Sequence, residues 1–79
     1  MRIVMRDGRV FQGTALQVVK AMQDIAFGVD DFTVAKYVEW VVANAQRFEG
    51  VDLNVHGEQD EERANSLISE MLRTGLASR

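Results

Sequence analysis

The alternation of apolar and polar residues between Thr33 and Phe48 is the clearest structural signal in this chain. When each residue advances about 100° around a helix axis, the apolar residues of this stretch fall on one broad side. That side consists of Val34, Tyr37, Val38, Val41, Val42, Ala45 and Phe48. The opposite side carries Lys36, Glu39, Gln46 and Arg47. The pattern predicts a helix that buries one side against the rest of the domain.

Trp40 falls outside the apolar side of this helix, on the flank that also carries Lys36 and Arg47. An indole in that position either covers another element of the same domain or contacts a partner, and the sequence leaves both interpretations open. The many valines of the helix are poor helix formers because β-branched side chains lose rotamer freedom there. We therefore expect tertiary packing to stabilise this helix.

The first residues of the chain predict a β-hairpin. Two extended, apolar-rich segments, residues 2–5 and 10–12, flank an Asp7-Gly8 pair, which is a strong hairpin signal. With Asp7 and Gly8 as a two-residue turn, the core side of the hairpin would carry Ile3, Met5 and Val10. The outer side would carry Arg2, Val4, Arg6, Arg9 and Phe11, a mixture of guanidinium groups and one aromatic ring.

A second helix is predicted directly after the hairpin. Thr14 as N-cap and Gln17 at the third following position form a plausible capping box, and Gly28 is the expected end. The predicted buried residues are Ala15, Val18, Val19, Met22, Ile25 and Ala26. The predicted solvent-facing residues are Gln17, Lys20, Gln23 and Asp24. The N-cap of the following helix, which the central stretch forms, could be Asp30, Asp31 or Thr33.

The last part of the chain predicts a third strand and a third helix. Residues 51–56 alternate apolar and polar side chains, with Val51, Leu53 and Val55 expected to face inward. After Gly57, acidic residues mark a helix start that complements the helix dipole. The predicted buried side of this helix is Ala64, Leu67, Ile68, Met71, Leu72 and Leu76. We expect Gly75 to end the helix and residues 77–79 to fray.

These elements give the order ββααβα and an α+β fold class. We expect residues 1–79 to form a single compact domain with a small antiparallel sheet of about three strands and helices packed on one face. The third strand could instead pair with the sheet edge of another chain, because a connection of two helices leaves its position open.

Composition narrows the function classes. The 79 residues are 47% hydrophobic and 27% charged, contain no cysteine or proline, and carry a formal net charge of −3. The negative charge argues against a general affinity for nucleic acid. The chain contains no apolar run long enough to span a membrane, its first residues lack a signal-peptide pattern, and we expect a cytoplasmic location.

The charge is unevenly distributed along the sequence. Residues 1–13 carry three arginines and one aspartate, whereas residues 49–62 carry six carboxylates and no basic residue. This asymmetry predicts a dipolar molecule, which could attract its own copies, orient a partner or neutralise itself within the sheet.

Residues able to perform catalysis are few. His56 is the only histidine, and Asp52 on the same predicted strand could complete a Ser-His-Asp arrangement only on paper. The acids that follow His56 match neither a zinc motif nor a calcium loop. The glycine spacing of residues 8–13 resembles a phosphate-binding loop, but Thr14 stands where that motif needs lysine. We expect no enzymatic activity, no cofactor and no metal.

The best candidate for a functional surface is the outer side of the hairpin, together with the tryptophan of the central helix. Its residues are Arg2, Val4, Arg6, Arg9, Phe11 and Trp40. The surplus apolar area predicts a protein-interaction or regulatory domain that binds itself as a homodimer or binds another protein. The alternative is a nucleic-acid-binding regulator in which the arginines contact phosphates and Phe11 stacks on a base.

Overall fold

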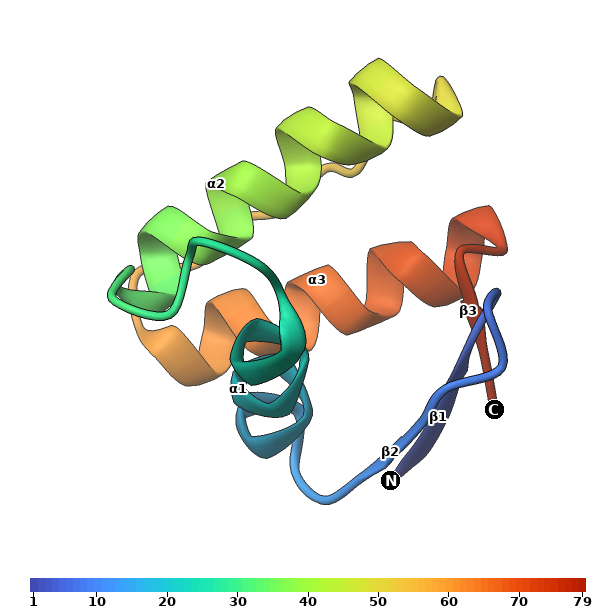
Figure 1. Cartoon of the computed structure of the whole chain (residues 1–79), viewed down its shortest axis with the longest axis horizontal. Helices are drawn as coiled ribbons and strands as arrows, with labels where there is room; N and C mark the ends of the chain where they lie inside the picture. The colour runs from blue at the N-terminus through green and yellow to red at the C-terminus, as the bar shows by residue number, and fades with distance from the viewer.

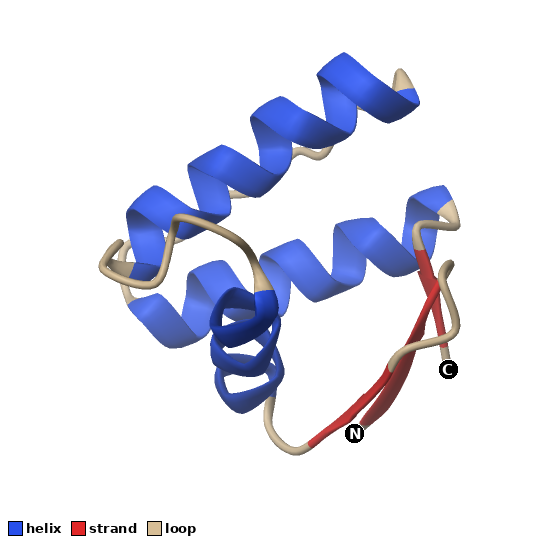
Figure 2. Ribbon diagram, viewed as in Figure 1, coloured by secondary structure: helices blue, strands red, loops and turns tan.

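The computed structural model describes all 79 residues and shows an α+β fold with a three-stranded antiparallel sheet (Figure 1). In chain order the elements are β1 (Arg2–Met5), β2 (Val10–Gln12), α1 (Ala15–Ile25), α2 (Val34–Asn44), the π-helix η1 (Ala45–Glu49), α3 (Asp60–Thr74) and β3 (Ala77–Ser78). The strand order is β2-β1-β3, and the helices lie on one side of the sheet (Figure 2). The predicted fold class is confirmed. None of the helices is both long and apolar enough to cross a membrane.

The third strand comes after the last helix rather than before it. β3 pairs antiparallel with β1, with Met5 opposite Ala77 and Val4 opposite Ser78. The prediction that residues 77–79 fray is therefore wrong at 77 and 78. The chain turns at Gly75, which caps α3 in the left-handed conformation, and returns directly to the free edge of β1. This arrangement makes β1 the central strand.

The predicted third strand, residues 51–56, forms no strand. It runs as an extended segment along α3, and its backbone N–H groups at Asn54 and His56 donate to side chains of that helix. Both edges of β1 are paired with β2 and β3, and this segment bonds to α3 instead of joining the sheet. The inward direction of its apolar side chains is nevertheless as predicted, since Leu53 is buried and Val51 and Val55 are half-buried against the core.

The hairpin closes with a three-residue loop instead of the predicted two-residue turn. The Met5 N–H donates to the Arg9 carbonyl at 2.8 Å, and the Gly8 N–H donates to the Met5 carbonyl at 2.9 Å. Gly8 has a φ of 92° and supplies the left-handed residue that a loop of this kind requires. Loop length sets the register of a hairpin, so this difference changes the pairing of β1 with β2.

The observed register differs from the prediction by one residue. Ile3 lies opposite Phe11, and Val4 lies opposite Val10. A shift of one residue exchanges the two faces of a strand. Phe11 is accordingly half-buried against the core and Val10 is exposed. The placement of Phe11 on the outer side and Val10 on the core side is therefore wrong.

The core lies between the sheet and the three helices, and α3 contacts α1, α2 and β3. Side chains that are fully buried include Ile3, Val18, Val19 and Leu67. Four of the six residues predicted to be buried on α3 are fully buried, and Leu72 is half-buried beside them. Leu76, the sixth, is buried just beyond the helix end.

The helix ends agree with the capping signals. Thr14 and Gln17 form the predicted capping box, and the Thr33 hydroxyl accepts a hydrogen bond from the Lys36 N–H, which identifies Thr33 as the N-cap of α2. α1 ends at Ile25, earlier than expected, so Gly28 lies in the loop between α1 and α2.

Gln23 is buried, although the sequence pattern placed it in water. Its side-chain amide donates to the carbonyls of Val29 and Phe32, both at 2.8 Å, and thereby fixes the loop between α1 and α2. Ile25 shows the opposite error, since it was predicted to be buried and is exposed. Ile25 is the last residue of α1 and faces solvent, whereas the carbonyls of the following loop lie within reach of the Gln23 amide.

We expect the change Gln23→Met to lower the free energy of unfolding by about 1–3 kcal/mol, because two carbonyls lose their hydrogen-bond donor while the volume is nearly kept. Urea denaturation measures this loss. Lys20→Met on the exposed side of α1 is the matched control and should change stability by less than about 0.5 kcal/mol. Equal effects of the two variants would contradict a structural role for the amide.

Candidate interaction surface

An apolar groove lies where α2 and η1 diverge from α3 and from the hairpin loop. The divergence is visible at the yellow end of α2 in Figure 1. The groove has a volume of about 380 Å³ and is open to solvent. Its apolar lining includes Met5, Met22, Tyr37, Val41, Ala45 and Met71. Most of its lining residues are apolar, and methionines are common in adaptable contact surfaces.

Two aromatic rings of α2 form one wall of the groove. Tyr37 stacks on Trp40 with the ring centroids 5.8 Å apart and the planes inclined by 23°. Tyr37 is buried, and burial raises the pKa of its hydroxyl to about 12, so the ring stays neutral. Trp40 remains 37% exposed. The indole thus covers Tyr37 with one face and leaves part of its surface free for a partner.

Phe48 lies on the same wall, seven residues after Val41 and three after Ala45, and is 72% exposed. Its predicted burial is wrong because the helix does not continue as an α-helix past Asn44. In the π-helix η1, hydrogen bonds join residues five apart, so each residue advances less around the axis. Phe48 therefore lies off the buried side of the helix. The Arg47 guanidinium lies 5.4 Å from the centroid of the Phe48 ring.

An ion pair crosses the mouth of the groove. Arg6 Nη1 donates to Glu49 Oε2 at 3.0 Å, and Arg6 Nε donates to the Gly75 carbonyl at 3.1 Å. The side chains of Arg6 and Glu49 are 54% and 47% exposed. A pair exposed to this degree contributes at most about 1 kcal/mol to stability. It links the basic N-terminal region to the acidic region that begins at residue 49.

The six residues predicted for the interaction surface do not form one surface. Arg6 and Trp40 line the groove. Arg2 and Val4 belong to β1 on the other side of the sheet layer, since β1 alternates and Ile3 is fully buried. Arg9 is exposed and pairs with Asp7 at 3.3 Å. The sixth, the ring from β2, is packed against the core as described above.

The nucleic-acid hypothesis loses its aromatic component through this arrangement. It required Phe11 to be exposed among arginines so that a base could stack on it. The half-buried ring lies against the core instead. Arg6 and Arg9 each already pair with a carboxylate, which reduces the positive charge available for phosphates.

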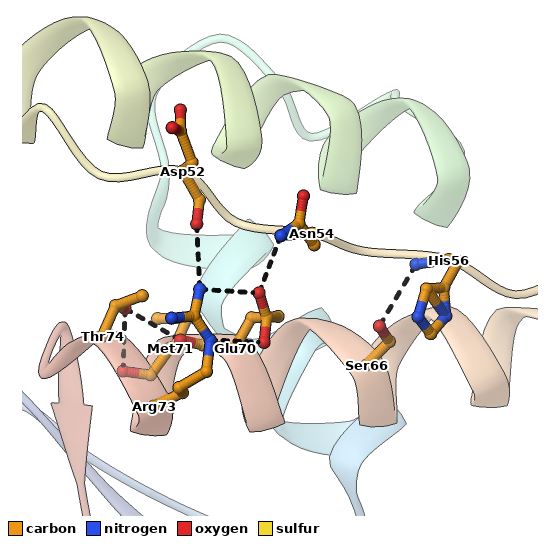
Figure 3. Close-up of polar contacts among 8 residues, drawn as sticks. All are labelled: Asp52, Asn54, His56, Ser66, Glu70, Met71, Arg73 and Thr74. Carbon is orange, nitrogen blue, oxygen red and sulfur yellow. Dashed lines mark hydrogen bonds and ion pairs between the residues drawn. The ribbon is translucent and has the colours of Figure 1, made fainter.

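A polar cluster on α3 holds the extended segment that precedes this helix (Figure 3). Glu70 accepts hydrogen bonds from the Asn54 N–H at 2.8 Å and from Arg73 Nε at 2.9 Å. Arg73 also donates to the Asp52 carbonyl at 3.2 Å. The hydrogen bonds from Arg73 and then from the Asn54 backbone lower the pKa of Glu70 from 4.5 to about 2. These contacts replace the strand pairing that the sequence pattern predicted.

The residues considered for catalysis have structural contacts. Ser66 is near His56, but the hydrogen bond of 3.2 Å runs from the His56 backbone N–H to the Ser66 hydroxyl, and the imidazole takes no part in it (Figure 3). Asp52 contributes its backbone carbonyl to the cluster, with no carboxylate contact to His56. No group of three or more acidic or histidine side chains is arranged to hold a metal ion.

Comparisons with protein-family models, with curated proteins and with solved structures give no match.

The Glu70 contacts predict a pH dependence of stability. Because the folded state lowers the pKa of Glu70 below its unfolded value, ionised Glu70 stabilises the fold above about pH 4.5, and this contribution is lost as the pH falls toward 2. Glu70→Gln should be less stable than the wild type at pH 7, with a difference that shrinks on acidification. Urea denaturation at pH 7, 5 and 3 measures it, with Glu39→Gln on the exposed side of α2 as the control. A difference that stays constant with pH would contradict the assignment.

Proposed function

We propose that this chain is a non-enzymatic protein-interaction domain that associates with itself as a homodimer. The observation that carries the proposal is the apolar groove with Trp40 and Phe48 exposed along one wall. An aromatic side chain that is 72% exposed beside an apolar hollow leaves apolar area in water, and covering both by association is favourable. Aromatic residues are also enriched among those that dominate binding energies.

Phe27 offers a different exposed ring, away from the apolar groove. It lies in the loop between α1 and α2, is 97% exposed and does not line the groove. A single exposed side chain is common on protein surfaces and needs no partner. The groove is the better candidate because several apolar groups meet there.

A non-enzymatic role is supported by the way polar groups are used. The polar cluster on α3 joins that helix to the extended segment of residues 51–56, and none of its residues lines the apolar groove. With the expected cytoplasmic location, in keeping with the absence of cysteine, the domain would act through its surface.

Light scattering at several protein concentrations, in low and high salt, tests the homodimer. We expect a mass near twice 8.9 kDa for the wild type. Phe48→Asp should raise the dissociation constant about thirtyfold or more, because a carboxylate then replaces the apolar anchor of the contact. Phe27→Asp makes the same change of side chain outside the groove and should leave the mass unchanged.

A wild-type mass near 8.9 kDa at every concentration would reject the homodimer. If Phe27→Asp instead of Phe48→Asp abolished association, the groove would be the wrong surface. Circular dichroism of both variants shows whether they keep the helices, and we expect no change because both rings are exposed in the monomer.

A further inference from the structure

The face that carries the groove presents a projection and a hollow side by side. Phe48 projects from η1, and the hollow begins at its foot, between Val41, Ala45 and Met71. A two-fold symmetric dimer uses one patch twice, so every group on one copy must meet a complementary group of the same patch. A patch with both a projecting ring and an apolar hollow satisfies this requirement without a second surface.

The π-helix accounts for the exposed position of Phe48 beside the groove. If α2 continued with α-helical geometry, Phe48 would follow Val41 and Ala45 on the same side, seven and three residues later. Its ring would then cover those two residues, which line the groove. The π-turn rotates Phe48 away from that side, and its ring stands largely in solvent at the edge of the groove. π-turns inside helices are rare and occur frequently at functional sites.

The charges at the groove mouth are also self-complementary. Arg6 and Glu49 lie side by side, and the Nε bond to the Gly75 carbonyl fixes the orientation of the guanidinium. Arg6 Nη2 and Glu49 Oε1 make no hydrogen bond within the chain. Each copy therefore retains one free donor and one free acceptor at the mouth. A two-fold axis beside the groove would bring opposite charges of the two copies together.

We propose that the occupant of the groove is a second copy of this chain, bound reciprocally. Phe48 of each protomer enters the apolar groove of its partner. Around these rings, Arg6 and Glu49 of both copies form one network of four alternating charges. This proposal rests on the homodimer proposed above and specifies its geometry.

Charge exchange between copies tests the reciprocal contact. Arg6→Glu leaves only negative charges in the network, and Glu49→Arg leaves only positive charges. Each variant alone should lose the dimer, with a dissociation constant raised about tenfold or more. An equimolar mixture should form a heterodimer of about twice 8.9 kDa, because each positive group then meets a negative group of the partner. The double variant Arg6→Glu/Glu49→Arg restores both signs within one chain and should dimerise alone.

Mixing the two single variants distinguishes an ion pair between copies from an ion pair within one chain. If the pair acts only inside each protomer, mixing restores nothing, and single variants that stay monomeric in the mixture overturn the reciprocal contact. Single variants that dimerise as well as the wild type overturn it too, while the homodimer itself would stand. A wild type that is monomeric throughout removes both proposals together.

Trp40 fluorescence gives a second readout that needs no variant to fold. Trp40 is the only tryptophan in the chain and lines the groove. Dilution of the wild type should shift its emission to longer wavelength as the partner's Phe48 leaves, with a midpoint equal to that of the mass change. Constant emission across the dissociation would place the interface elsewhere and overturn the proposal.

Discussion

The burial of one side of α3 is the constraint on which the other elements depend. α1, α2 and β3 all contact this helix, and the fully buried residues Ala64, Leu67 and Ile68 lie at the centre of these contacts. A chain of this size has a single small core, so losing any one of the three contacts would expose much of it. The polar side of α3 is also engaged, since Glu70 and Arg73 bind the backbone of the segment that leads into the helix. The apolar side of α3 thus packs against the other elements, and its polar side binds the extended segment.

Much of the fold could be predicted because its signals are local. Helix sides follow from spacing along the sequence, and the capping box of Thr14 and Gln17 joins residues only three apart. The third strand depended on distant pairing. Alternation at residues 51–56 states correctly which side chains face inward, but a half-buried segment beside a helix gives the same alternation as a strand. Which segment reaches the edge of β1 is decided by where α3 ends, and this is absent from the local pattern.

The candidate surface was harder to predict because it depends on two small departures from regular geometry. A loop longer by one residue reversed the faces of β2, which moved Phe11 inward and removed the expected aromatic-arginine surface. A π-turn of five residues moved Phe48 outward although its spacing placed it on the buried side. An Asp-Gly pair is compatible with hairpin loops of two and of three residues. The sequence of residues 45–49 likewise does not distinguish an α-helical from a π-helical ending. Of the six residues predicted for the interaction surface, Arg6 and Trp40 line the groove.

The three-residue hairpin loop and the π-turn both shape the part of the groove where Arg6 pairs with Glu49. The three-residue loop frees Arg6 from the hairpin pairing that a two-residue turn would impose, so its guanidinium reaches Gly75 and Glu49. The π-turn brings Glu49 to that guanidinium and turns Phe48 toward solvent. An α-helical ending would turn the phenyl ring toward the side that carries Val41 and Ala45, which would leave less of it in solvent. The exposed phenyl ring beside an apolar groove is the strongest physical reason to look for a partner there.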